Sequence, residues 1–112
     1  MKVSSPIERK MFGSWIREKR KEAGYSVPEA ARKIGFSIGR LKQIECGYDP
    51  IPLMRLFDII KIYEIDLEEL LERLQAWEPE LYEKFIFLER KFLELFVNRY
   101  TSHRQAQPQY MG

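Results

Sequence analysis

The stretch that decides the fold is SVPEAARKIGFSIGRLKQIECG, residues 26–47. Its first part begins with the Ser-x-x-Glu pattern of a capping box, formed by Ser26 and Glu29, which marks a helix start. Gly35 stands where a residue in the left-handed conformation can end a helix without a Cβ penalty. The apolar residues between them recur at helical spacing. We therefore expect a short helix over residues 27–34.

The second part of the stretch predicts another short helix directly after the first. Ser37 is a suitable N-cap, and Gly47 is placed to close the helix. Leu41 and Ile44 would face inward, while the residues around them are polar. This gives a helix over residues 37–45. Two helices joined by so brief a turn must cross steeply, which is the geometry of a helix-turn-helix.

In these positions the chain resembles the DNA-binding domain of the lambda repressor/Cro (Xre) family. The small residue of the first helix is Ala31, and the turn carries Gly35. The residues that fill the inner face are Ile34, Phe36, Leu41 and Ile44, and the matching flanks are Phe12, Ile16, Arg20–Gly24, Ile44–Gly47 and Leu56–Leu71. The resemblance covers roughly residues 9–73. It implies an all-α fold with a five-helix domain that binds double-stranded DNA.

Apolar periodicity on both sides of the motif predicts the remaining helices. The expected spans are 6–22 before the motif, and 53–63, 67–77 and about 80–100 after it. The domain organisation that follows is a flexible N-terminus over 1–5, a helix-turn-helix domain over 6–78, a C-terminal dimerisation helix over 79–100 and a disordered tail over 101–112.

The C-terminal helix carries a heptad-like seam, because its apolar residues recur at alternating steps of four and three. The residues predicted to lie in a dimer interface are Leu81, Phe85, Leu88, Phe92, Leu95 and Phe96. A lone terminal helix with so much aromatic surface must bury it. A two-fold homodimer is the simplest solution. The alternatives are a helix that completes a monomer core, or one that binds a different protein.

The charge is unevenly distributed along the chain. Residues 1–61 carry 13 Lys/Arg against 7 Asp/Glu, whereas residues 62–112 carry 6 against 10. The basic half contains the helix-turn-helix. A positive field over that half would attract a phosphate backbone, so the distribution favours DNA as the partner.

The resemblance implies which side chains read bases, because in this family the second helix of the motif enters the major groove. The residues implied are Ser37, Ile38, Gly39, Arg40 and Gln43. Arg40 can pair with guanine and Gln43 with adenine in a bidentate manner. The alternative for both is an ordinary solvated surface, and for Ile38 a contact with a partner protein.

Phosphate contacts are implied for Arg17, Val27, Lys42 and Tyr48. Relatives often carry glutamine at the position of Val27, where it helps to hold a phosphate at the helix N-terminus. Val27 cannot do this, Pro28 has no N–H, and Glu29 adds a negative charge, so this clamp should be weaker here. Arg17 could instead lie on a solvated face, and Tyr48 could be a packing residue.

Several classes of function are excluded or disfavoured. Cys46 and His103 are the only residues of their types and have no motif around them, so we expect no intrachain disulfide, metal site, cofactor or catalytic centre. No apolar run approaches the ~20 residues that span a bilayer, and the N-terminus shows no signal peptide. A cytoplasmic protein with neither a membrane association nor a small-molecule substrate is expected.

The leading interpretation is a sequence-specific transcriptional regulator, a repressor that binds a near-palindromic operator as a homodimer. The alternative is a protein-interaction module or an antitoxin. In that case the helix-turn-helix is a scaffold, and the aromatic C-terminal helix binds a partner protein.

Overall fold

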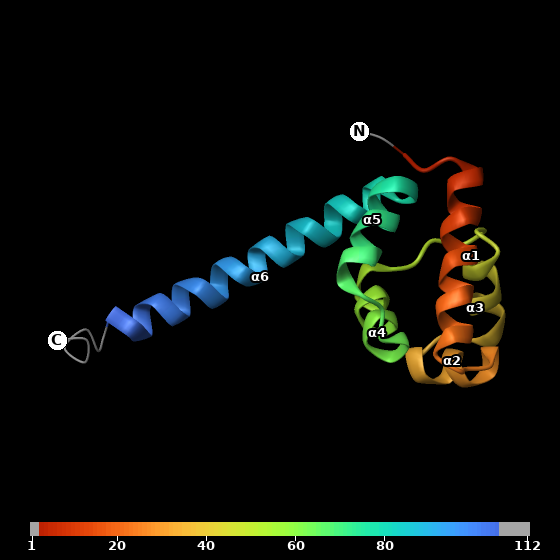
Figure 1. Ribbon diagram of the computed structural model, residues 1–112, viewed down its shortest axis with the longest axis horizontal. Helices are drawn as coiled ribbons and strands as arrows, with labels where there is room; N and C mark the ends of the chain where they lie inside the picture. The colour runs from red at the N-terminus through yellow and green to blue at the C-terminus, as the bar shows by residue number, and fades with distance from the viewer. Residues whose placement is uncertain (1–2, 106–112) are drawn as a thin grey trace. The chain divides into compact units, whose positions relative to one another are not determined.

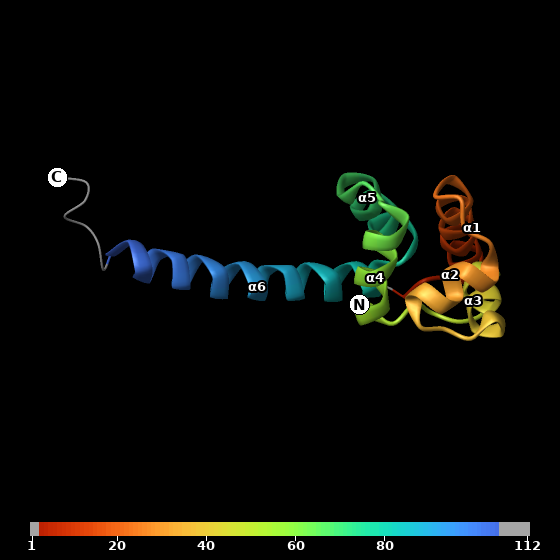
Figure 2. The same cartoon turned by 90° about the horizontal axis from the view of Figure 1, so that it is seen from below.

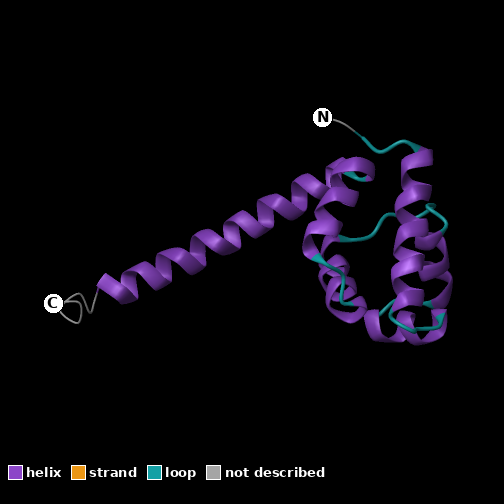
Figure 3. Ribbon diagram, viewed as in Figure 1, coloured by secondary structure: helices purple, strands orange, loops and turns teal. Residues whose placement is uncertain are grey.

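The computed structural model describes residues 3–105, and side chains up to residue 95. The helices are α1 (Pro6–Glu22), α2 (Val27–Ile34), α3 (Ile38–Glu45), α4 (Leu53–Tyr63), α5 (Leu67–Trp77) and α6 (Pro79–Gln105) (Figures 1 and 3). Over this range the chain contains no strand. The predicted all-α class, with five helices followed by a C-terminal helix, is confirmed.

The chain divides into two compact units, Met1–Tyr82 and Glu83–Gly112. The helix α6 begins in the first unit and continues through the second. It runs to Gln105 rather than ending at Tyr100, and the expected disorder of the tail stays a prediction. The rest of that tail lies outside the described residues. None of the helices in residues 3–105 is long and apolar enough to cross a membrane.

The starts of α1 and α2 are specified by the same local device. The hydroxyl of Ser26 accepts the N–H of Glu29 at 3.3 Å, and the Glu29 carboxylate accepts the N–H of Ser26 at 3.1 Å. This confirms the predicted capping box. Ser5 and Glu8 form an equivalent box at α1, with distances of 3.1 and 2.9 Å. Gly35 ends α2 with φ 94°, the left-handed conformation expected for it.

Ser4 and Ser5, which belong to the segment expected to be flexible, both form side-chain hydrogen bonds. Besides the cap formed by Ser5, the hydroxyl of Ser4 donates a hydrogen bond to the Glu78 carboxylate at 3.0 Å. Burial raises the pKa of Glu78, and the hydrogen bond from Ser4 partly opposes that rise. The start of the chain is thus tied to the end of α5.

The core of the first unit is formed by α1–α5. Helix α1 packs against α3 and α5, while α2 packs against α3 and α4 (Figures 1 and 2). The largest fully buried side chains are Ile16, Ile34, Leu41, Ile44, Leu56, Ile59, Leu70 and Leu74. Because Leu41 and Ile44 are among them, one face of α3 is held by the core and the opposite face is left exposed.

At Gly13 the backbones of α1 and α3 lie close together. A Cβ atom at Gly13 would lie 2.5 Å from the carbonyl oxygen of Ile44 and 2.7 Å from that of Glu45. Both obstacles are backbone atoms, which a rotamer change cannot move aside. Only glycine permits this approach, and it brings the end of α3 against the middle of α1.

A buried ion pair joins the same two helices. The Arg20 Nε donates to Glu45 Oε2 at 2.7 Å, and a second guanidinium nitrogen donates to Oε1 at 3.1 Å. A third nitrogen donates to the carbonyl of Tyr25 at 2.7 Å. Arg20 and Glu45 are 6% and 9% exposed. The hydrogen bond to Glu45 raises the pKa of Arg20 above its ordinary value, so the guanidinium stays charged.

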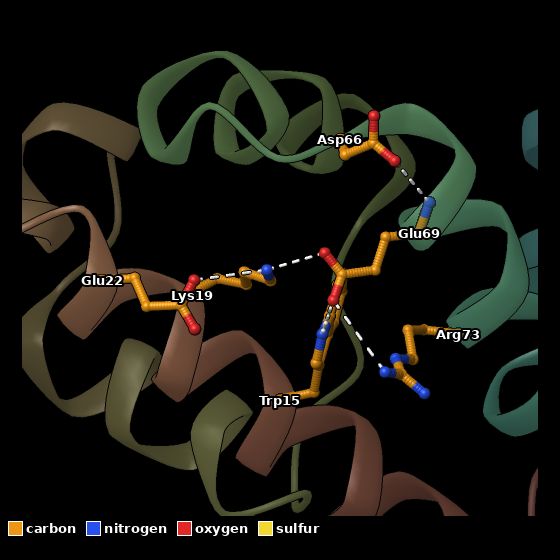
Figure 4. A network of polar contacts seen from close by, with 6 residues as sticks. All are labelled: Trp15, Lys19, Glu22, Asp66, Glu69 and Arg73. Atoms are coloured by element: carbon orange, nitrogen blue, oxygen red, sulfur yellow. Dashed lines mark hydrogen bonds and ion pairs between the residues drawn. The ribbon is translucent and has the colours of Figure 1, made fainter.

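A second polar network joins α1 to α5 near the surface (Figure 4). The Lys19 ammonium lies 2.7 Å from the Glu69 carboxylate, which also accepts the Trp15 indole N–H at 3.3 Å. Glu69 itself is held at the start of α5, where its N–H is capped by Asp66 at 3.1 Å. The hydrogen bond from Lys19 lowers the pKa of Glu69. The basic run at the end of α1 is therefore not uniformly solvated, since two of its members are engaged inside the domain.

Candidate nucleic-acid interface

The predicted base-contacting residues all lie on the exposed face of α3 or at its cap. They are Ser37, Ile38, Gly39, Arg40 and Gln43. The hydroxyl oxygen of Ser37 accepts the N–H of Arg40 at 3.1 Å, so its main role here is to begin the helix. Ile38 is 45% exposed, as several other large apolar residues of the protein are, so its side chain is accessible to a ligand.

Arg40 has the freedom that base recognition requires. Its guanidinium lies over the ring of Phe36, 5.3 Å from the ring centre, which orients the side chain. Within residues 3–105 it forms no ion pair, so its planar set of N–H donors is available for a ligand. The arrangement suits bidentate hydrogen bonding to a guanine edge.

Gly39 has no role in the packing of the domain. A Cβ atom placed there meets nothing within 4 Å, in contrast to Gly13. Gly39 also has an ordinary helical backbone, because it is absent from the glycines with positive φ. An exposed glycine in a helix costs about 1 kcal/mol relative to alanine. The fold therefore gives no reason for glycine at this place.

We expect Gly39→Ala to stabilise the protein and to weaken its binding to DNA. The added methyl group improves helix propensity by up to about 1 kcal/mol. In the expected contact with DNA, the same methyl group would keep a groove edge away from the α3 backbone. Thermal unfolding and DNA titration of the same variant measure the two effects. Unchanged DNA affinity would mean that the backbone at this place does not approach DNA.

Three of the four residues predicted to contact phosphate surround one open hollow of about 230 Å³. Arg17 comes from α1, Val27 from the start of α2 and Lys42 from α3. The remaining lining residues are Arg20, Glu45 and Cys46. Within the described part of the chain, neither Arg17 nor Lys42 forms an ion pair. The hollow therefore offers two unpaired cations to an anion.

Tyr48, the fourth predicted phosphate residue, does not line this hollow. It lies in the loop after α3 and is 68% exposed, which is not the burial of a packing tyrosine. Its N–H donates to the carbonyl of Gln43 at 2.9 Å, so the loop is held against the end of α3. The hydroxyl is left at the surface.

The N-terminus of α2 has few backbone donors left for an anion. The N–H of Glu29 is used by the Ser26 hydroxyl, and the N–H of Ala30 donates to the Ser26 carbonyl at 3.0 Å. Pro28 has no N–H. Only the N–H of Val27 remains, and the Glu29 carboxylate lies beside it. The backbone hydrogen bond from Ser26 lowers the pKa of Glu29, so this carboxylate is charged at neutral pH. The weak phosphate clamp expected from the sequence has this physical basis.

The predicted dimer interface is only partly exposed. Leu81 and Phe85 are buried within the single chain, Leu88 is half-buried, and Phe92 and Leu95 are exposed. The side chain of Phe96 lies outside the part of the chain that the structure describes. Leu81 and Phe85 expose little surface, and their place in a dimer interface stays a prediction. Among the described side chains of α6, those up to residue 95, the large exposed apolar residues are Phe87, Phe92, Leu93 and Leu95.

Sequence reasoning missed the two features that fix α3 in place. Gly13 and the Arg20–Glu45 pair join residues that lie far apart along the chain, and no short motif contains them. A signal was present nonetheless, since Arg20 and Glu45 both lie at positions that carry the family resemblance. A buried role for this pair was not deduced from those positions.

These features define a class of protein. A pair of short helices, α2 and α3, crosses at a glycine turn, and the exposed face of α3 lies next to an unpaired basic hollow. This is a helix-turn-helix domain in the arrangement used for DNA binding.

Comparison with protein families agrees with this class. Residues 16–70 match the family model described as "Helix-turn-helix". The chain therefore carries a helix-turn-helix domain of the lambda repressor/Cro-like family, as the sequence resemblance predicted, and this indicates a DNA-binding regulator. Comparisons with curated proteins and with solved structures give no match.

Proposed function

We propose that this protein is a sequence-specific transcriptional regulator that binds a near-palindromic operator as a homodimer and represses by occluding a promoter. The observation that carries the proposal is the hollow beside the exposed face of α3, which is lined by Arg17 and Lys42, two cations that form no ion pair in the described part of the chain. A phosphate held in the hollow would place the DNA backbone alongside α3. Its exposed side chains would then face the major groove.

Base recognition in this proposal is divided among three side chains. Arg40 would donate two hydrogen bonds to a guanine, and Gln43 would pair with an adenine. Ile38 would pack on a thymine methyl group, which explains why a large apolar residue is left exposed there. Each contact reads a different chemical feature, so together they specify a half-site.

Phosphate anchoring would depend on side chains more than on a helix N-terminus. Since α2 retains only the N–H of Val27 for an anion, most of the binding energy at this locus would come from Arg17 and Lys42. Such contacts release counterions, so the affinity should fall steeply as the salt concentration rises.

Homodimer formation is proposed from the exposed apolar side chains of α6. Phe87 and Phe92 are 63% and 65% exposed, and Leu95 is 71% exposed. Apolar surface of this kind marks an interface, and two-fold dimers are the commonest soluble oligomers. Two recognition helices on one face of DNA require half-sites ~34 Å apart, or about 10 base pairs.

The test is selection of binding sites from a random DNA pool with the purified protein. An enriched near-palindrome with half-sites about one helical turn apart supports the regulator and supplies its operator. Absence of enrichment with a well-folded protein would reject it.

On the selected operator, we expect Arg40→Ala to cost about 1–3 kcal/mol of binding free energy and to relax specificity at one position of each half-site. Titration of the operator and of single-base variants measures both effects. Arg55→Ala is the control, because Arg55 is an exposed arginine of α4 that is already paired with Asp58 at 3.2 Å. Equal affinities for the two variants would remove Arg40 from the base-reading residues.

A second candidate is a protein-interaction module or antitoxin. Two observations favour it: the exposed Ile38 in the middle of the proposed DNA surface, and the charged Glu29 carboxylate at the start of α2. It would be supported if the protein bound no DNA and substitution of Phe92 by glutamate abolished capture of a partner protein.

A further inference from the structure

Helix α1 carries a basic stripe, and two of its charged residues belong neither to the predicted base-contacting residues nor to the lining of the hollow. Its members are Lys10, Ser14, Arg17 and Lys21, which are all exposed. They recur at steps of four, three and four residues, so they lie on one face of the helix. At 1.5 Å per residue the stripe is about 16 Å long.

The charges of the stripe are not neutralised by the domain. Lys19 and Arg20, also in α1, are paired with Glu69 and Glu45. By contrast, Lys10 and Lys21 form no ion pair within residues 3–105. The exposed acidic residues of α1 are Glu18 and Glu22, and Glu22 is paired with Lys19 while Glu18 lies nearer to the stripe. Helical periodicity places it on the flank of the stripe opposite to Gly13, and therefore away from α3.

Two contacts place the stripe beside the residues already assigned to DNA. In its middle, Arg17 shares the hollow with Lys42. Toward the N-terminus, the backbone of Lys10 touches the loop after α3, since a Cβ atom on Gly47 would lie 2.8 Å from the Lys10 Cα. The residue after Gly47 is the exposed Tyr48. The stripe therefore runs along α3 and its following loop from one phosphate locus to the other.

We infer that Lys10 and Lys21 form, with Arg17, a rail along α1 that binds the DNA phosphate backbone. This inference rests on the proposed function and adds its phosphate-binding path. The rail substitutes for the anion site that α2 has largely lost to the Ser26–Glu29 capping box. It carries no sequence information, because phosphates are the same at every base pair. It positions the domain so that α3 can read the bases.

The inference is tested by the salt dependence of binding to two duplexes, the selected operator and a shuffled duplex of the same composition and length. Each lysine that contacts a phosphate makes the slope of log affinity against log salt concentration more negative by about 0.9. Lys10→Gln and Lys21→Gln should each make this slope less negative by about that amount on both duplexes. Lys61→Gln is the matched control, because Lys61 is an exposed lysine of α4 with the same change in net charge.

The outcomes separate this inference from the proposed function. If Lys42→Gln makes the slope less negative while Lys10→Gln and Lys21→Gln leave it at the wild-type value, Lys10 and Lys21 do not bind phosphate, and the proposal of a DNA-binding regulator is unaffected. If Lys61→Gln changes the slope as much as Lys10→Gln and Lys21→Gln do, the effect is one of net charge, and the rail is again wrong. If the wild-type protein binds neither duplex, both proposals fail. Thermal unfolding of the variants should be unchanged, since these side chains are exposed and unpaired.

Discussion

Gly13→Ala is expected to destabilise the domain by about 3 kcal/mol or more, since overpacking a close-packed contact costs this much when the obstacle cannot relax. The new Cβ would lie 2.5 Å from a backbone oxygen of α3, so α1 and α3 must move apart. That movement disturbs the neighbouring ion pair of Arg20 with Glu45. The gain in helix propensity from alanine, about 1 kcal/mol, does not compensate.

The measurement is thermal unfolding followed by circular dichroism. For a domain of this size, a loss of 3 kcal/mol corresponds to a fall in Tm of roughly 12–24 °C. Gly39→Ala is the matched control, because it makes the same chemical change in a helix where the Cβ meets nothing within 4 Å. A Gly13→Ala protein as stable as the Gly39→Ala protein would show that α1 and α3 are farther apart than described here.

Glu45→Gln should be about as destabilising, at roughly 3–5 kcal/mol, because it removes one partner of a buried ion pair and leaves the other charged. Arg20 cannot respond by losing its proton, since arginine is always protonated in proteins. The glutamine amide also turns an N–H donor toward a guanidinium that has only donors to offer. Since small domains have a total stability of about 5–15 kcal/mol, this loss is a large part of the free energy of unfolding.

Urea unfolding measures this loss, and two further variants make it interpretable. Arg55→Met breaks the exposed pair with Asp58 and should change the stability by about 0.5 kcal/mol or less. Replacing Arg20 and Glu45 together by methionine removes both buried charges and should recover much of the loss. If Glu45→Gln unfolds at the same urea concentration as Arg55→Met, the pair is solvated and does not hold α3.

The helix boundaries of the first unit were predictable because they are encoded locally. Each of these helix ends is marked within four residues of chain: the start of α2 by Ser26 with Glu29, its end by Gly35, and the starts of α3 and α5 by Ser37 and Asp66. The structure continues α6 to Gln105, beyond the expected boundary at Tyr100. The hydrogen bond between Ser4 and Glu78 joins residues far apart in the sequence, so no local pattern predicts it.

The site was predictable only in part. The exposed face of α3 follows from helical periodicity once Leu41 and Ile44 are placed in the core. The hollow does not follow from helical periodicity, because Arg17, Val27 and Lys42 come from three different helices. The approach of α1 to α3, which brings Arg17 near Lys42, depends on Gly13. The spacing of apolar and polar residues predicts which residues share one helix face, whereas this site depends on how different helices pack against one another.

The position of Cys46 has a practical consequence. It is the only cysteine of the chain, it is exposed, and it lines the hollow beside Lys42. A thiol-reactive fluorophore will therefore attach at one defined point without any engineered residue. Because Arg20 and Glu45 line the same hollow, the dye would sit next to a rigid ion pair. If the proposed phosphate contact forms there, such a dye would compete with it, so labelling of Cys46 should weaken binding to DNA.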